Sequence, residues 1–267
     1  MKVIAINGSP HKNGLTQQLL DQAAEGAESQ GLEVERWLLA DYHIEPCQAC
    51  RGSNCWTTGK CTKFEDDLPK LNEELDKADG LIFGAPVYYL DMNGIPKNFL
   101  DRTRLLNVNG KPAMGIAVAG GSGKGLTSAL KSLYYYFFCV NLRGIHPLPV
   151  CRFNFDKARK EAYEGGVEVA RKTSQVEPFS GLADRFVWHR DTKFMDFDII
   201  DENLYLDQLI IENTKPSDEF GRKELETAKS ECEIASELVQ QGKKDEAAPH
   251  IEKAYIHGTT AWNSLHK

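Results

Sequence analysis

Short apolar runs alternate with amphipathic stretches throughout residues 1–172, and this alternation constrains the fold more than any other feature of the sequence. Five runs have strand character: Lys2–Asn7, Leu32–Leu39, Gly80–Ala85, Ala113–Ala119 and Gly144–Cys151. Gly80–Ala85 and Ala113–Ala119 are continuously apolar, which is typical of strands buried on both faces. The alternation therefore predicts a parallel sheet with helices on both faces.

The stretches between and after these runs have helical spacing. Helices are expected over Leu15–Gln30, Asp66–Lys77, Ile95–Leu105, Leu126–Val140 and Asp156–Lys172. Five such units match the flavodoxin-like strand order 2-1-3-4-5, in which ligands bind beyond the carboxyl ends of the strands. The predicted fold class is α/β, a doubly wound five-stranded parallel sheet. Its first, third and fourth strands should be followed by the ligand loops.

The composition changes after Lys172. Residues 173–217 are expected to be irregular but packed, because they are rich in aromatic side chains. Glu219–Gln241 and Lys244–Leu265 are expected to form a helical hairpin. We therefore expect two domains, 1–172 with the ligand site and 173–267 as a mainly helical appendage. The appendage is expected to pack on its own subunit or on a neighbour.

Charge and apolar content narrow the class of protein. Lys and Arg number 32 against 39 Asp and Glu, a net charge of −7, which disfavours nucleic acid and anionic membrane surfaces as partners. No run is long and apolar enough to predict a membrane span. The first strand begins at Lys2 without the regions of a secretory signal, so a cytoplasmic location is expected. Clustered cysteines there favour metal binding or redox chemistry over structural disulfides.

Four of the seven cysteines lie in the loop 46–62. Cys47, Cys50, Cys55 and Cys61 form the pattern C-x2-C-x4-C-x5-C. Four thiolates complete either an iron–sulfur cluster or a tetrahedral zinc site. Zinc sites of this kind usually pair two knuckles far apart in sequence, so one compact loop favours the cluster. Free thiols or a redox disulfide are the remaining alternatives.

The loop after the first strand reads NGSPHKNGLT, from Asn7 to Thr16, and leads into a helix. The free N–H groups of a helix N-terminus suit a phosphate, and the hydroxyls of Ser9 and Thr16 and the ring of His11 add donors. The loop is neither a G-x-G-x-x-G fingerprint nor a G-x-x-x-x-G-K-[ST] loop. An ordinary strand–helix turn is the alternative.

Three loops together resemble those of the NADPH-dependent FMN reductase and iron–sulfur flavoprotein family. The first is similar to the motif G-S-P-R-x-x-G-N-T, with His11 where Arg is common and Leu15 where Asn is common. The second, Gly84–Arg102, resembles the family's P-V-Y, Lys and D-R pattern. The third is AGGSGKG, Ala119–Gly125, whose glycines allow a backbone to approach a ligand closely. The resemblance covers about residues 1–172.

The resemblance implies a bound FMN, with its phosphate at the first loop and its ring between the second and third. The implied contacts are Ser9, Pro10, His11, Gly14, Leu15, Thr16, Pro86, Val87, Tyr88, Tyr89, Gly120, Gly121 and Ser122. Plain packing is the alternative for the two tyrosines. No side chain is assigned as a catalytic acid, base or nucleophile, because the flavin carries the redox chemistry.

The family's iron–sulfur members resemble C-x2-C-x2-C, then a fourth cysteine and a D-D pair, here Asp66–Asp67. Cys47, Cys50 and Cys61 fit this pattern, whereas Ser53 stands at the third position and Cys55 is displaced by two residues. The resemblance thus implies a 4Fe-4S cluster held by Cys47, Cys50, Cys55 and Cys61.

Together these features predict an iron–sulfur flavoprotein that moves electrons between an external donor and acceptor through FMN and a 4Fe-4S cluster. The resemblance implies ferredoxin or NAD(P)H as donor and a small-molecule oxidant as acceptor. It also implies a homodimer or homotetramer, whose interface residues 173–267 are expected to extend. The alternatives are a cluster-free NAD(P)H-dependent FMN or quinone reductase, and a flavodoxin-like carrier or zinc-stabilised binding module.

Overall fold

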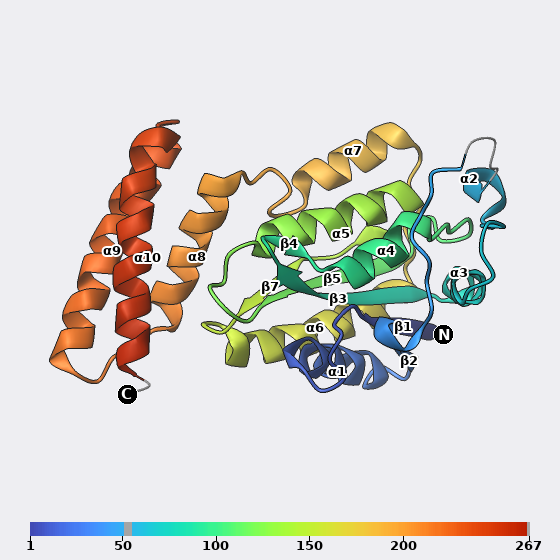
Figure 1. Cartoon of the computed structure of the whole chain (residues 1–267), viewed down its shortest axis with the longest axis horizontal. Coiled ribbons are helices and arrows are strands. Elements are labelled where there is room, and N and C mark those ends of the chain that lie inside the picture. The colour runs from blue at the N-terminus through green and yellow to red at the C-terminus, as the bar shows by residue number, and fades with distance from the viewer. Residues whose placement is uncertain (51–54, 266–267) are drawn as a thin grey trace. The chain divides into compact units, whose positions relative to one another are not determined.

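The computed structural model describes residues 1–50 and 55–265 (Figure 1). The chain forms two compact units. The first contains Met1–Gly120, Gly125–Pro149 and Asp156–Met195, and the second contains Gly121–Lys124, Val150–Phe155 and Asp196–Lys267. No helix in the described part of the chain combines the length and apolarity that crossing a bilayer requires.

A parallel sheet forms the centre of the first unit. Its strands are β1 (Lys2–Asn7), β2 (Glu33–Leu38), β3 (Gly80–Tyr88), β5 (Pro112–Ala119) and β6 (Arg143–Gly144). They lie in the order β2-β1-β3-β5-β6, with Ile4 opposite Leu81 and Ile82 opposite Met114. Counted along the chain, this is the predicted order 2-1-3-4-5. The α/β fold class, including a helical C-terminal part, is confirmed.

The fifth strand is interrupted, although the sequence pattern predicted one continuous run over Gly144–Cys151. The structure has β6 and then β7 (Leu148–Cys151), and both pair with β5. Pro147 lies between them and Pro149 lies within β7. Proline has no N–H to donate to a ladder and restricts the residue before it, so two prolines in this stretch explain the break.

Helices cover both faces of the sheet, as predicted. They are α1 (Leu15–Glu28), α3 (Leu68–Lys77), α4 (Gly94–Arg102), α5 (Leu126–Val140) and α6 (Phe155–Thr173). In Figure 1, α1 and α6 lie on one side of the sheet and α4 and α5 on the other. Helices α1 and α6 touch through glycine: a Cβ on Gly166 would lie 1.8 Å from the carbonyl oxygen of Ala23. A larger residue at this position would force the two backbones apart.

Residues 173–217 are more regular than predicted, because they contain α7 (Leu182–Asp191) and α8 (Ile199–Asn213). Helix α8 begins with a capping box. The Asp198 carboxylate accepts bonds from the N–H groups of Ile200 and Asp201, and the Asp201 carboxylate accepts one from the N–H of Asp198. This reciprocal pair fixes the start of the helix. The high aromatic content of the segment obscured this start signal.

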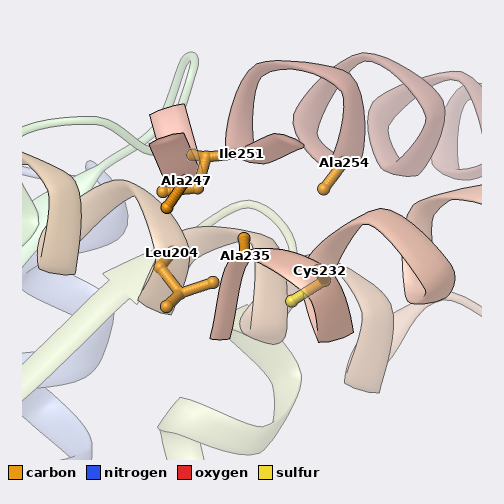
Figure 2. Close-up of a cluster of buried hydrophobic side chains, with 6 residues drawn as sticks. All are labelled: Leu204, Cys232, Ala235, Ala247, Ile251 and Ala254. Atoms are coloured by element: carbon orange, nitrogen blue, oxygen red, sulfur yellow. The ribbon is translucent and has the colours of Figure 1, made fainter. Parts of the chain in front are cut away.

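The second unit is dominated by α8, α9 (Glu219–Gln240) and α10 (Lys244–Ser264). The predicted hairpin is present, with α9 and α10 side by side (Figure 1). Small buried residues recur every seven positions, at Ala228 and Ala235 on α9 and at Ala247, Ala254 and Ala261 on α10. They let the helix axes approach closely. Figure 2 shows one cluster of this interface, in which Leu204, Cys232 and Ile251 pack with Ala235, Ala247 and Ala254.

Candidate functional site

The first candidate loop is held by its own side chains. The Asn7 carboxamide oxygen accepts a bond from the Ser9 N–H at 2.8 Å, and the Ser9 hydroxyl accepts one from the His11 N–H at 3.1 Å. Both Ser9 and Thr16 are buried. Helix α1 follows from Gly14, and no described side chain caps it. A preformed loop with an uncapped helix N-terminus has the chemistry of an anion site.

This loop packs directly on Gly84 of β3 and on the start of α4. The Gly8 N–H donates to the Gly84 carbonyl at 2.8 Å, and a Cβ on Gly8 would lie 3.0 Å from Pro96. A Cβ on Gly120, at the end of β5, would lie 3.6 Å from Leu15. The ends of the first, third and fourth predicted strands therefore meet, as a flavodoxin-like sheet requires.

The second candidate loop is a tight hairpin between β3 and β4 (Asp91–Met92). Tyr88 pairs with Asp91, so Tyr89 and Leu90 form a two-residue turn. Their φ angles are +49° and +68°, in the left-handed region that bulky residues rarely adopt. Backbone strain of this kind persists only where surrounding contacts impose it.

Two contacts hold this hairpin. A Cβ on Gly125 would lie 2.5 Å from the Cα of Leu90, so the turn rests against glycine backbone. The Ser132 hydroxyl donates to the Asp91 carboxylate at 3.0 Å. Of the predicted contact residues here, Pro86 is buried, Val87 is half-buried, and the Tyr88 and Tyr89 side chains are exposed. The exposed rings are available to lie against a flat ligand.

The third candidate loop is divided between the two units. Gly120 belongs to the first, whereas Gly121 and Ser122 belong to the second and are exposed there. The structure thus brings Gly120 beside the first loop and places Gly121 and Ser122 in the unit of the C-terminal helices.

The four loop cysteines line one pocket of about 540 Å³. Cys47 and Cys50 are exposed, whereas Cys55, which opens the short helix α2 (Cys55–Thr58), and Cys61 are half-buried. The other side chains along its wall are Gln48, Ala49, Trp56, Lys60, Thr62, Lys63, Phe64, Arg102 and Arg104. The described lining thus has four cations and no acid, although acidic residues outnumber basic ones in the whole chain. Ser53, the residue at the family's third cysteine position, lies outside the described residues.

Arg102 closes the base of this loop. Its guanidinium donates to the Glu45 carbonyl at 2.8 Å and to the Cys61 Sγ at 3.3 Å, and it forms an ion pair with the Asp66 carboxylate. The side chains of Arg102 and Asp66 are 2% and 0% exposed. Arg102, at the end of α4, therefore bonds to residues at both ends of the loop: Glu45 before it, and Cys61 and Asp66 after it.

A backbone clasp reinforces this closure. The Asp66 carboxylate accepts a bond from the Glu45 N–H at 2.9 Å, and the Asp67 carboxylate accepts one from the His43 N–H at 2.7 Å. The Asp67 N–H donates to the His43 carbonyl at 3.0 Å. Asp66 and Asp67, the predicted D-D pair, thus join the two ends of the loop through hydrogen bonds to the backbone of Glu45 and His43.

The surroundings of Cys61 favour its thiolate. Burial raises the pKa of the Cys61 thiol, but hydrogen bonds from the Lys63 backbone and from Arg102 outweigh burial, and the pKa lies below its usual value. Burial likewise opposes ionisation of Asp66, but Arg102 and the Glu45 N–H bring the pKa of Asp66 below its usual value. The thiolate is the form that binds metals.

The pocket lined by the four thiols can be compared with a metal centre. Among residues 1–50 and 55–265, no group of three or more His, Cys, Asp or Glu is arranged to hold a metal ion. The donor set and the surrounding charge suit a four-thiolate metal centre, and the ligand assignment stays a prediction.

Sequence reasoning missed two aromatic–arginine pairs beside this pocket. The Arg104 guanidinium lies 3.6 Å from the centroid of the Trp56 ring, and that of Arg102 lies 4.7 Å from the Phe64 ring. Trp56 is exposed and Arg104 is buried. The D-R motif, Asp101–Arg102, marks Arg102 in the sequence as a residue of interest. Nothing in the sequence indicates which residues Arg102 contacts.

Comparison with known proteins agrees with this geometry. The sequence model of the NADPH-dependent FMN reductase family matches residues 1–152. An iron–sulfur flavoprotein of Methanocaldococcus jannaschii is 32% identical over 141 residues, which cover 51% of this chain and 72% of that protein. One of Archaeoglobus fulgidus is 39% identical over 105 residues, covering 39% and 50%. An NADPH azoreductase of a Bacillus species is 32% identical over 134 residues, covering 50% and 67%.

Solved structures support the fold. A flavone reductase superposes with a TM-score of 0.52 at 17% identity over 69% of each chain. An NADH:FMN oxidoreductase in its apo form superposes with a TM-score of 0.50 at 20% identity, over 69% of this chain and 93% of the other. Because the family model covers more than half of the sequence, the chain belongs to the NADPH-dependent FMN reductase family, a family of FMN-dependent oxidoreductases.

Proposed function

We propose that this protein is an iron–sulfur flavoprotein, an FMN-dependent oxidoreductase whose cysteine loop holds a 4Fe-4S cluster. The observation that carries the cluster is the pocket lined by Cys47, Cys50, Cys55 and Cys61. Iron–sulfur clusters are held by four cysteine thiolates. The names of the archaeal relatives, iron–sulfur flavoproteins, point the same way.

The flavin would be bound by the three loops at the carboxyl ends of the strands. Ser9, Thr16 and the uncapped start of α1 would hold the phosphate through hydroxyl and N–H donors. Tyr88 and Tyr89 would lie along the ring system. When bound, FMN supplies the electron-transfer chemistry, and the protein supplies binding and orientation.

The charge of the cysteine pocket supports the cluster assignment. Four thiolates bring a concentration of negative charge that is costly to bury without compensation. Lys60, Lys63, Arg102 and Arg104 provide opposite charge around it, and Arg102 donates directly to the Cys61 sulfur. Hydrogen bonds to cluster sulfurs also tune the reduction potential.

The donor and acceptor are proposed from the family. Ferredoxin or NAD(P)H would supply electrons, and a small oxidant would receive them. The protein would act as a homodimer or homotetramer in the cytoplasm.

The decisive experiment is flavin, iron and sulfide analysis of protein purified without oxygen. We expect one FMN and about four iron atoms per chain. Cys55→Ser should lose iron and keep FMN. Cys139→Ser is the matched control, because Cys139 is also an exposed thiol but lies on α5, outside the loop, and it should keep both. Full iron content in Cys55→Ser would refute the ligand assignment.

A cluster-free NAD(P)H-dependent FMN or quinone reductase is the second candidate. The similarity to an NADPH azoreductase favours it. Flavin without iron, together with steady NADPH oxidation, would establish this candidate instead.

A further inference from the structure

The second unit includes two short segments that come from the flavodoxin-like part of the sequence. Besides α8, α9 and α10, it contains Gly121–Lys124 and Val150–Phe155. Gly121–Lys124 follow β5 after Gly120 and include two predicted flavin contacts, Gly121 and Ser122. The family match ends at residue 152, so the C-terminal helices have no role assigned by that match.

Helix α10 holds this loop at two points through one side chain. The Tyr255 hydroxyl donates to the Ser122 carbonyl at 3.1 Å. The Lys124 Nζ lies 4.8 Å from the centroid of the Tyr255 ring, within the range of a cation–π interaction. Tyr255 thus contacts the residues on either side of Gly123: the backbone of Ser122 and the side chain of Lys124.

Helix α8 holds the same loop between these points. Gly123 is buried and has a φ angle of +84°. A Cβ there would lie 2.7 Å from Leu206 on α8 and 3.5 Å from the Cβ of Cys151. The loop backbone therefore fits against α8 in a conformation that only glycine adopts easily.

An unpaired acid faces the same loop. Asp207 follows Leu206 on α8 and is 1% exposed, and neither of its carboxylate oxygens has a hydrogen-bond partner among the described residues. Lys124 is the cation that acts on it electrostatically. On α10, the Trp262 ring packs edge-on against Phe153, with the ring centroids 5.1 Å apart, and so contacts the segment Val150–Phe155.

We propose that the C-terminal helices hold loop Gly121–Lys124 in its flavin-binding conformation, and that Tyr255 is a positioning residue for FMN. This inference rests on the proposed function, because it takes the loop to be a flavin contact. Tyr255 acts through the Ser122 carbonyl and the Lys124 side chain, so replacing it loosens the loop without changing any residue that would touch the flavin.

Tyr255→Phe and Tyr255→Ala test the proposal. Tyr255→Phe removes the bond to Ser122 and keeps the ring beside Lys124, whereas Tyr255→Ala removes both. We expect FMN to dissociate about 5-fold faster from the first variant, since such a bond contributes about 1 kcal/mol and each 1.4 kcal/mol is a factor of ten. The second variant also loses the contact with Lys124, so dissociation should be more than about 10-fold faster. Tyr163→Phe, at an exposed tyrosine of α6, is the matched control and should be unchanged.

Amide hydrogen exchange of FMN-free protein gives an independent readout. Gly123 and Lys124 should exchange faster in Tyr255→Phe and faster still in Tyr255→Ala, while amides of β1 keep their protection. Unchanged exchange at these two residues would overturn the proposal, and so would faster exchange with unchanged FMN dissociation. If the wild-type protein bound no FMN, the proposed function would fail, whereas the exchange experiment would still report whether Tyr255 holds the loop.

Discussion

The Arg102 guanidinium donates to the Cys61 sulfur at 3.3 Å while it pairs with the buried Asp66 carboxylate. The bond joins α4, at one edge of the candidate flavin site, to the end of the cysteine loop. The same guanidinium reaches the Glu45 carbonyl, just before the first cysteine. Arg102 therefore contributes to the loop base together with the backbone bonds of Asp66 and Asp67.

Arg102→Lys should open the loop base. Lysine keeps the charge but has one nitrogen, so it cannot bond Glu45, Cys61 and Asp66 together. Breaking a buried ion pair costs about 3–5 kcal/mol when one partner is removed, so Arg102→Ala should approach that loss and Arg102→Lys should lose less. Urea unfolding measures the stability, and iron content after anaerobic purification measures the loop.

Arg190→Lys is the control for this pair of variants. Its side chain is 71% exposed, and among the described residues it pairs with its neighbour Asp191, so the free energy of unfolding should stay close to that of wild type. Wild-type stability and iron content in Arg102→Lys would show that the loop base closes without this residue.

Relief of backbone strain is expected from Leu90→Gly. Leu90 has a φ angle of +68° and a half-exposed side chain. Glycine at this position therefore relieves the backbone strain, and little buried apolar surface is lost with the leucine side chain. We expect a gain of about 0.5–1 kcal/mol in the free energy of unfolding. Leu106→Gly is the control, because Leu106 is equally exposed but does not have a positive φ angle; it should be less stable than wild type. A loss of stability in both variants would mean that Leu90 is unstrained.

The sheet order was predictable because its signal is local. Strand and helix periodicities are carried by neighbouring residues such as those of Gly80–Ala85, and parallel topology restricts how such units combine. Pro147 and Pro149 also indicate the split of the fifth strand. The apolar residues of Gly144–Cys151 nevertheless suggested one continuous strand. The seven-residue spacing of alanines in α9 and α10 is another local signal, and it predicts close helix packing.

The site was only partly predictable because its contacts are long-range. The sequence indicates four cysteines in one loop, but the bond from Arg102 to Cys61 spans 41 residues and that from Tyr255 to Ser122 spans 133. No periodicity encodes such pairs. The turn at Tyr89 and Leu90 is hidden for another reason: its sequence lacks the glycine and asparagine that usually mark this geometry.

Asp207 should make stability fall as pH rises from about 4 to 8. Burial raises its pKa from 3.8 to about 8, and Lys124 only partly opposes this rise. Between these values the folded protein keeps a proton on Asp207 that the unfolded chain releases. The folded state thus binds more protons, so raising the pH favours unfolding by up to about 1.4 kcal/mol per pH unit.

Asp207→Asn should lose this slope. Asparagine has nearly the same shape and no charge, so the variant should match wild type near pH 4 and become more stable by a few kcal/mol near pH 8. Urea unfolding at pH 5, 6, 7 and 8 measures the difference. Asp245→Asn, which removes an exposed carboxyl of α10, is the matched control for the loss of one acid. Parallel pH curves for Asp207→Asn and wild type would mean that Asp207 is ionised in the folded protein, with Lys124, Tyr255 and Cys232 rearranged around its charge.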